Sequence, residues 1–155
     1  MADRDLDKTF LGRGWSFPPE FHKHAREVKM VAADPDIQES LTVLLSTRPL
    51  ERLMHPTFGC SIHDMIFESI NESTITEIKD RVQKAILFFE PRITVDRIFV
   101  ETDEEKNGVL RILVEYTIRT TNTRSNLVYP FYLKEGTNTA FLLGPKQTPS
   151  LEDTP

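Results

Sequence analysis

The chain has 155 residues, about the length of one domain, of which 39% are hydrophobic and 28% charged. Nineteen basic and 24 acidic side chains give a net charge of −5, which argues against a protein that binds the phosphates of nucleic acid. The sequence has neither an apolar run of about 20 residues that could span a membrane nor the apolar core of a secretory signal. Its single cysteine excludes an internal disulfide. We therefore expect one soluble domain in the cytoplasm, without membrane insertion and without nucleic acid as a partner.

Residues 1–33 are predicted to form a polar N-terminal arm in an extended conformation. Pro18 and Pro19 oppose a helix or a central strand there. The arm holds the only tryptophan, Trp15, close to Phe17. A large aromatic side chain usually docks on apolar surface. We expect Trp15 to pack on the core of its own chain, with docking on a partner as the alternative.

Two amphipathic helices are predicted after the arm. The first has Asp34 as N-cap residue and Pro35 at the first helical position. The longer one begins at a capping box formed by Thr74 and Glu77, and it ends at Pro91. Each carries one apolar stripe at helical spacing. The stripes are Ile37, Leu41, Leu44 and Leu45 in the first helix, and Ile75, Ile78, Val82, Ala85, Ile86 and Phe89 in the second.

Residues 48–60, between the two helices, are predicted to form an ordered loop. Pro49, Pro56 and Gly59 punctuate this stretch, but it carries too many large apolar side chains for a linker. The apolar residues Ile62, Ile66 and Ile70 then predict a short helix.

Three strands are predicted in the second half of the chain, at residues 93–101, 109–120 and 126–133. Apolar and polar residues alternate along the middle strand, so one of its faces should be buried. The alternation of the first strand changes phase near Asp96 and Arg97, which predicts a β-bulge. Turns are predicted at Asn107-Gly108 and at residues 121–125. Pro130 lacks an N–H group, so it places the last strand at a sheet edge.

The order of these elements indicates an α+β fold. Two main amphipathic helices plus a short helix would pack on a three-stranded antiparallel meander, because the apolar face of the strands needs a cover. This domain would span residues 34–135, after the extended N-terminal arm at 1–33. A mostly flexible tail, rich in threonine and proline, would follow at 136–155.

Common catalytic and ligand-binding patterns are incomplete in this sequence. Gly12-x-Gly14 lacks the third glycine and the preceding strand of a dinucleotide-binding fingerprint. His22-x-His24 lies in the polar arm without converging metal ligands, and Cys60 lacks the third member of a triad. We expect no cofactor and no metal site.

Three carboxylates, Glu68, Glu72 and Glu90, raise the alternative of a glycosidase pair. That chemistry needs two carboxyl groups facing each other across a sugar cleft, one of them with a raised pKa. The sequence supplies the acids without any sign of the cleft, and 24 acidic residues make chance pairs easy. We therefore predict no catalytic residue.

The stretch Glu90-Pro91-Arg92 lies where the long helix passes into the first strand, between apolar neighbours. Two opposite charges in such surroundings are costly unless they are paired. One interpretation is a structural ion pair within the chain. The other is a charged pair that fixes the docking of a partner, for which the planar guanidinium of Arg92 is suited. The residues alone leave both open.

Four motifs occur in order along residues 10–135. They are Trp15-Ser16-Phe17-Pro18, Glu51-Arg52-x-Met54-x-Pro56-x-Phe58-Gly59, Glu90-Pro91-Arg92-Ile93, and Thr121-Asn122 followed by Asn126-Leu127-Val128-Tyr129-Pro130-Phe131. In this order and spacing they resemble the baseplate wedge, or sheath-initiator, family of contractile injection systems. That family includes the small wedge protein of T-even phages and the TssE-like proteins of type VI secretion. The chain departs from the family's pattern at Leu50, where the family usually has glycine before Glu-Arg.

The resemblance implies a structural protein without enzymatic turnover. Several copies would form a ring in a baseplate beside the tube, and the first sheath ring would add onto an edge strand of the sheet. Sheath subunits, other wedge proteins, and tube or hub proteins are the implied partners, in a phage-tail-like particle or a secretion apparatus. Glu90 and Arg92 would bind the sheath or another partner. The residues implied to contact wedge proteins or to structure the loop are Trp15, Phe17, Glu51, Arg52, Met54, Pro56, Phe58 and Gly59.

Two other functions stay open. Members of the family have carried a lysozyme label, so one is a muramidase-like cell-wall hydrolase. A distant branch of the same fold acts as an anti-adaptor that blocks the delivery factor of a protease, so the other is a regulatory binding module. Cell-wall cleavage that depends on one carboxylate would indicate the first, and co-purification with an adaptor instead of sheath would indicate the second.

Overall fold

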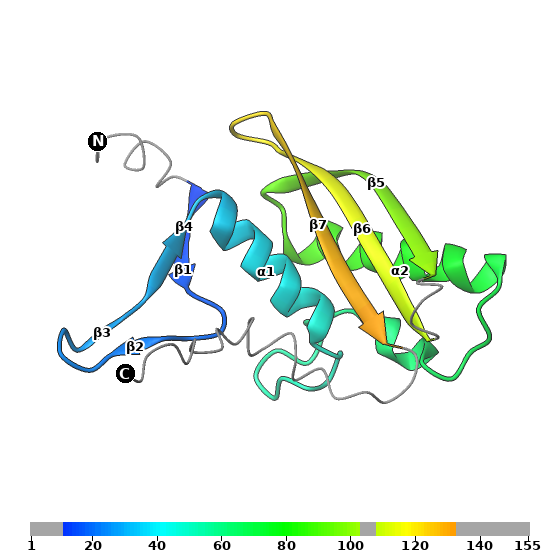
Figure 1. Ribbon diagram of the computed structural model, residues 1–155, viewed down its shortest axis with the longest axis horizontal. Coiled ribbons are helices and arrows are strands. Elements are labelled where there is room, and N and C mark those ends of the chain that lie inside the picture. Colours follow the sequence, from blue (N-terminus) through cyan, green and yellow to red (C-terminus); the bar gives the residue numbers. More distant parts are fainter. Residues whose placement is uncertain (1–10, 103–107, 133–155) are drawn as a thin grey trace, which may run out of the picture.

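The computed structural model describes residues 11–102 and 108–132 of the chain. Four short strands come first, followed by two helices with a 3₁₀-helix between them, and then by three long strands (Figure 1). In chain order the elements are β1 (Arg13–Trp15), β2 (Phe21–His22), β3 (Glu27–Val28), β4 (Met30–Ala32), α1 (Asp34–Ser46), η2 (Ser61–Met65), α2 (Glu72–Phe89), β5 (Ile93–Thr102), β6 (Val109–Ile118) and β7 (Thr123–Tyr132). No helix within these ranges is long and apolar enough to cross a membrane. The predicted tail at 136–155 lies outside the described residues.

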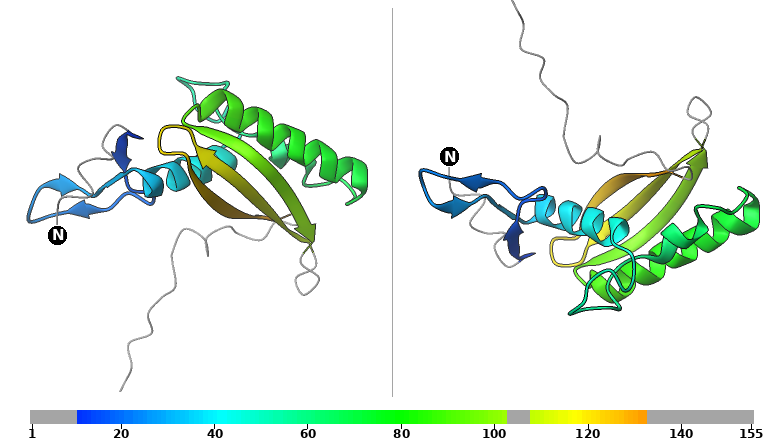
Figure 2. Two further views of the ribbon diagram at one scale, coloured as in Figure 1. Left: turned by 90° about the horizontal axis from the view of Figure 1, so that it is seen from above. Right: turned by 90° about the horizontal axis from the view of Figure 1, so that it is seen from below.

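The three long strands form one antiparallel sheet in the order β5–β6–β7, so the expected α+β class is confirmed. Both α1 and α2 cover the same face of this sheet, α2 along β5 and α1 along β7 (Figures 1 and 2). Every second side chain of β6 is buried under the helices, as the alternation predicted. These residues are Leu110, Ile112, Val114, Tyr116 and Ile118.

Both edges of the sheet carry an irregularity that the sequence predicted. The pairing of β5 with β6 shifts between Val95 and Arg97, which confirms the bulge near Asp96. On the other side, Pro130 lies in the edge strand β7, opposite Arg111 of β6. Proline is tolerated there because an edge strand leaves one side of its backbone unpaired.

The arm is more structured than predicted. β1 pairs with β4 and β2 pairs with β3, so residues 13–32 form a long, interrupted hairpin that projects from the domain (Figures 1 and 2). Pro18 and Pro19 lie between the two ladders, where the ladder needs no N–H donor. Trp15 is 63% exposed, so the expectation that it packs on the core of its own chain is wrong.

Both helix starts differ from the predicted caps. α1 already includes Asp34, and its N-cap residue is Ala33, at a φ of 62° and without a side-chain hydrogen bond. α2 begins earlier than expected, at Glu72, and the side chain of Asn71 accepts a hydrogen bond from the N–H of Thr74. Asparagine caps a helix at least as well as threonine. Which of several neighbouring polar residues serves as the N-cap therefore depends on the path by which the chain enters the helix.

Two shorter elements also differ from the prediction. The short helix is the 3₁₀-helix η2, which ends at Met65. The turn before the last strand occupies residues 119–122, with Asn122 at a φ of 52°, so β7 begins at Thr123. Asparagine is one of the few residues that adopt this left-handed backbone readily. Of the predicted Asn107-Gly108 turn, Asn107 lies outside the described residues.

His63 connects η2 to two other elements of the core. Its Nε2 lies 3.1 Å from the carbonyl oxygen of Leu45 in α1, and its ring meets that of Phe131 in β7 edge-on, with centroids 5.6 Å apart. Burial lowers the pKa of His63 below its ordinary value of 6.5. The unfolded chain therefore binds a proton at this residue at a higher pH than the folded chain does.

Acidification should consequently weaken the fold. The stability that depends on neutral His63 is complete above pH 6.5 and declines as the pH falls below that unfolded-state value. We expect the free energy of unfolding, measured in urea, to decrease from about pH 7.5 to about pH 5.5. His63→Asn should lose much of this decrease, and His24→Asn, at an exposed position in the arm, should keep it. An unchanged pH dependence in His63→Asn would contradict the assignment.

Candidate functional site

Glu90 and Arg92 form a bidentate ion pair where α2 passes into β5. Glu90 is the C-cap residue of α2, and its backbone N–H donates to the carbonyl of Ile86. The Nε and Nη2 of Arg92 donate to the two carboxylate oxygens of Glu90 at 2.5 and 2.7 Å. The Glu90 side chain is only 3% exposed and that of Arg92 is 28% exposed. The intrachain ion pair, one of the two interpretations of this stretch, is therefore present in the structure.

The pair also connects α1 and the arm. The Nη1 of Arg92 donates to Oδ2 of Asp36 at 2.6 Å and to the carbonyl oxygen of Leu11 at 2.8 Å. The hydroxyl of Ser40 donates to Oε2 of Glu90 at 2.6 Å. Asp36 and Ser40 lie one turn apart on α1. We call these five residues, Leu11, Asp36, Ser40, Glu90 and Arg92, the charged cluster.

Two carboxylates share one guanidinium in the charged cluster. The hydrogen bond to Glu90, and then the one to Asp36, raise the pKa of Arg92 above its ordinary value. Burial by itself raises the pKa of Glu90, but the hydrogen bonds from Arg92 and Ser40 outweigh it and hold that pKa below 4.5. Glu90 is therefore ionised at neutral pH and lacks the raised pKa that a general acid of a glycosidase needs.

The arm approaches the charged cluster closely at two glycines. A Cβ atom at Gly12 would lie 3.1 Å from Nη1 of Arg92, and one at Gly14 would lie 2.5 Å from a carboxylate oxygen of the cluster. Gly12 also has a φ of 103°, which other residues rarely adopt. Beyond the glycines, the N–H of Phe17 donates to Oε2 of Glu39 on α1 at 2.8 Å. These contacts fix the base of the arm against α1.

The loop at 48–60 packs on the end of α2 through aromatic side chains. The guanidinium carbon of Arg52 lies 4.1 Å from the centroid of the Phe58 ring, in cation–π geometry. Phe58 in turn packs on Phe89 of α2, with ring centroids 5.2 Å apart, and His55 meets both rings edge-on. Met54, by contrast, is 98% exposed.

Backbone hydrogen bonds close the same loop. Oε2 of Glu51 accepts from the N–H of Arg48 at 2.9 Å, and the carbonyl of Pro56 accepts from the N–H of Leu50 at 2.7 Å. Gly59 has a φ of 126°, and a Cβ atom there would lie 2.5 Å from the carbonyl oxygen of Thr47. Only glycine fits this close approach.

A cleft of about 290 Å³ lies between the arm, α1 and the loop. Four of the residues that the resemblance assigned to partner contact converge on it, together with two members of the charged cluster. Glu51, Pro56 and Gly59 shape the loop beside the cleft, whereas Met54 does not line it. The residues that line the cleft are Trp15, Phe17, Asp36, Glu39, Ser40, Val43, Arg52 and Phe58.

The contribution of α1 to this site was missed in the sequence. Asp36, Glu39, Ser40 and Val43 recur at helical spacing on one face of the helix, opposite the buried apolar stripe. This spacing was the available signal. It does not identify a site by itself, because the solvent-facing side of any surface helix shows the same polar pattern.

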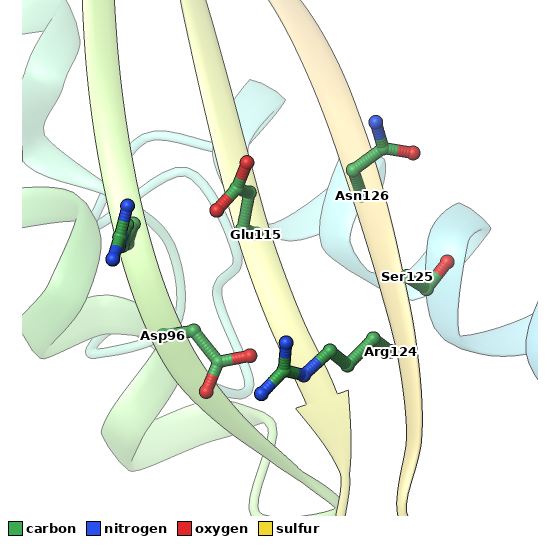
Figure 3. Close-up of a pocket in the computed structure, with 6 residues that line it drawn as sticks. Asp96, Glu115, Arg124, Ser125 and Asn126 are labelled. Atoms are coloured by element: carbon green, nitrogen blue, oxygen red, sulfur yellow. The ribbon is translucent and has the colours of Figure 1, made fainter.

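A second hollow, of about 580 Å³, lies over the sheet face that the helices leave uncovered. Figure 3 shows Asp96 of β5 and Arg124 of β7 pointing toward each other, with Glu115 on the strand between them, β6. Within the described ranges no group of three or more His, Cys, Asp or Glu side chains could hold a metal ion. The described residues that line the hollow are all polar or charged: Asp96, Arg97, Glu115, Arg124, Ser125 and Asn126.

Comparison with known proteins assigns the chain to a family. Residues 31–123 match the family described as baseplate wedge protein gp25. The chain belongs to this family of baseplate wedge proteins. The matched region includes the Glu90–Arg92 pair and residues 51–59, but not Trp15 and Phe17. The resemblance found in the sequence is therefore confirmed.

Individual relatives agree with this assignment. The baseplate wedge protein gp25 of Enterobacteria phage T4 is 33% identical over 82 residues, which are 53% of this chain and 55% of the phage protein, so the chain spans about half the length of that relative. A crystal structure from Geobacter sulfurreducens, provisionally named a tail lysozyme, is 47% identical with a TM-score of 0.64, over 68% of this chain and 95% of the other.

Two solved baseplates contain chains of the same fold. One chain in the 6-fold symmetrised cryo-EM structure of the anti-feeding prophage baseplate is 27% identical, with a TM-score of 0.63, over 90% of this chain and 100% of the other. A chain in the baseplate complex of the type VI secretion system is 15% identical with a TM-score of 0.54, over 64% and 92% of the two chains, which shows a shared fold alone.

Removing the guanidinium of the charged cluster should destabilise the fold strongly, because Glu90 would stay buried without its partner. We expect Arg92→Ala to lower the free energy of unfolding by about 3–5 kcal/mol. Arg97→Ala, which removes an exposed arginine of β5, should change it by less than about 0.5 kcal/mol. Urea denaturation measures both variants. If Arg92→Ala changed the free energy of unfolding as little as Arg97→Ala, the charged cluster would not be what holds α1, α2 and the arm together.

Leu50 adopts a φ of 72°. This left-handed backbone costs a non-glycine residue about 1–2 kcal/mol, and the side chain is 78% exposed. We expect Leu50→Gly to raise the free energy of unfolding by about 0.5–1 kcal/mol. Leu53→Gly, at a 93% exposed residue of the same loop without a positive φ, should not raise it. Thermal denaturation of both variants tests this, and a loss of stability in Leu50→Gly would contradict it.

Proposed function

We propose that this chain is a structural baseplate component of a contractile injection machine and that it initiates polymerisation of the sheath. The observation that carries the proposal is the outer edge of β5, which pairs with no other strand of the described residues. An edge strand presents N–H and C=O groups that can pair with a strand of another chain. Membership of the baseplate wedge family supports the baseplate role, and the sheet edge supports the initiating role.

The two edges of the sheet differ in how well they can accept a strand. Pro130 deprives β7 of one N–H donor in the middle of a possible ladder. The bulge interrupts β5 only near Asp96, and residues 97–102 pair with β6 in continuous register. We infer that a sheath strand adds along residues 97–102 of β5.

The charged cluster and the cleft beside it supply a second proposed contact. A guanidinium has five N–H donors, and Arg92 makes four hydrogen bonds among the described residues. The fifth donor, on a side chain that is 28% exposed, can reach a carbonyl or carboxylate of a partner, while Glu90 holds the guanidinium in place. The cleft, which Phe17 and Phe58 line among other residues, can receive an apolar side chain of a wedge protein.

The remaining partners follow from the same proposal. Several copies would form a ring around the tube, with sheath subunits on one side and other wedge, tube or hub proteins on the other. The related chain from a 6-fold symmetrised baseplate supports the ring. Assembly would take place in the cytoplasm and would involve no enzymatic turnover.

Hydrogen–deuterium exchange tests the strand addition. The tagged full chain, co-purified with sheath subunits, is compared with the chain alone. We expect the backbone amides of residues 97–102 to gain protection in the complex and those of β7 to gain none, because the new ladder forms on β5 only. Protection on β7 instead, or on neither edge, would contradict the proposal. Recovery of wedge and sheath subunits in the same purification, identified by mass spectrometry, tests the baseplate role separately.

A cell-wall hydrolase is the second candidate, because the open sheet face brings Asp96 and Glu115 to one hollow. A glycosidase needs one carboxyl group in apolar surroundings that keep it protonated. Arg97 and Arg124 line the same hollow, so the surroundings of Asp96 and Glu115 are charged and polar instead of apolar. Peptidoglycan cleavage by the purified chain that disappears in Glu115→Gln would establish this candidate.

A further inference from the structure

The projecting arm exposes an aromatic pair. Trp15 in β1 and Phe21 in β2 meet edge-to-face with ring centroids 6.3 Å apart, and they are 63% and 67% exposed. Two large aromatic side chains that cover each other only partly leave apolar surface to water, which marks a surface for another protein.

The arm that carries this pair has a net positive charge. Residues 13–29 contain four basic and two acidic side chains, Arg13, Lys23, Arg26 and Lys29 against Glu20 and Glu27, so their net charge is +2. Lys29 is paired with Glu20. Lys23 and Arg26, at the turn between β2 and β3, form no ion pair with any described residue. The arm therefore combines an exposed aromatic pair with a basic turn at its tip, in a chain whose overall charge is −5.

The segment between η2 and α2 has the complementary character. Phe67 is 91% exposed and Ile70 is 40% exposed. Residues 64–77 contain four acidic side chains, Asp64, Glu68, Glu72 and Glu77, and no basic one. Arg81 of α2 pairs with Asp64 at 3.5 Å and with Glu77 at 2.6 Å, so Glu68 and Glu72 are the acidic side chains of this segment without an ion pair among the described residues. This segment therefore offers apolar side chains among carboxylates, and the arm offers apolar side chains among cations. Such a combination of an apolar centre and oppositely charged surroundings is typical of matched protein interfaces.

The two surfaces lie at opposite ends of the molecule. The hairpin of β2 and β3 projects from one end, and the beginning of α2 lies at the other (Figures 1 and 2). One chain therefore cannot bring its own two surfaces together. A symmetric dimer through either surface would place like charges opposite each other, which is unfavourable. A head-to-tail contact between copies brings opposite charges together. It builds a ring when the rotation from one copy to the next closes after a whole number of copies.

We propose that the arm of one copy docks on residues 64–77 of the next copy, with Trp15 and Phe21 against Phe67 and Ile70, and with the basic tip against the acidic side chains. The proposal specifies the contact between copies in the ring proposed above. It does not depend on binding to sheath, because both surfaces belong to this chain.

Cysteine crosslinking of the full chain tests the contact. The native Cys60 is 1% exposed, and burial raises the pKa of its thiol to about 11, so it does not compete for a maleimide at neutral pH. His24→Cys labels the tip of the arm and Ser69→Cys labels the acidic segment, both at exposed positions. A short bismaleimide then reports which positions meet in solution.

The pattern of products distinguishes the possible contacts. We expect each single-cysteine variant to stay monomeric, an equimolar mixture of the two to give dimers, and a chain carrying both cysteines to give dimers and larger multimers. The control mixture of His24→Cys with Asn126→Cys, at an exposed position on the open sheet face, should give only background. Dimers from His24→Cys alone, or no more dimer in the test mixture than in the control, would overturn the proposal.

Charge exchange adds a second readout that misfolding would not mimic. Introducing Glu68→Lys into the Ser69→Cys chain should lower the dimer yield about fivefold. Introducing Lys23→Glu into the His24→Cys partner should restore it, since the two charges are then opposite again. A dimer yield that stays low in this combination would contradict the proposed pairing of the charged surfaces. If the chain co-purifies with sheath subunits but the two cysteine variants do not crosslink, only the contact between copies is overturned. The proposed baseplate function then stands.

Discussion

The bidentate bond between Arg92 and Glu90 is the interaction on which the arrangement of the other segments depends. A carboxylate that is only 3% exposed stays ionised only where its charge is compensated. Arg92 gives it two nearly parallel hydrogen bonds and still reaches Asp36 and the carbonyl of Leu11. The end of α2, the first turn of α1 and the base of the arm therefore meet at one planar group. A lysine would keep the charge but could not hold these directions at once.

The two interpretations of Glu90 and Arg92 are compatible for the same reason. An intrachain ion pair normally argues for a purely structural role. Here the pair also sets the position of the arm and of α1, and these elements form two walls of the cleft. A partner that docks in the cleft would thus depend on the charged cluster even where it touches Arg92 only at its exposed edge.

The loop at 48–60 forms the third wall of the cleft, and its position depends on local backbone geometry. The loop at 48–60 closes through Gly59, whose close approach to Thr47 allows no side chain, and through Leu50, which occupies a left-handed conformation. Glycine would suit the second position on simple steric grounds. The loop keeps its shape with leucine because Arg52, Phe58 and the hydrogen bond to Pro56 hold it from several sides.

Features that depend on short-range pattern could be predicted from the sequence. Alternation along residues 109–118 predicted the buried face of β6, a change of phase predicted the bulge, and Pro130 predicted an edge strand. The order of four motifs indicated the family, and the motifs at 51–59 and 90–93 lie within the residues that match it, 31–123. The helix caps were less certain, because several neighbouring polar residues could serve and the incoming chain path chose among them.

Contacts between residues far apart in the chain became known only from the folded structure. Arg92 binds Asp36, 56 positions earlier, and no periodicity in the sequence encodes a contact of that range. The same applies to Trp15: its size predicted that it packs on something, but the hairpin of the arm carries it away from the core and leaves it exposed. The opposite charges of the arm and of residues 64–77 are visible in the sequence. Their separation to the two ends of the molecule, which makes an intramolecular contact impossible, follows only from the fold.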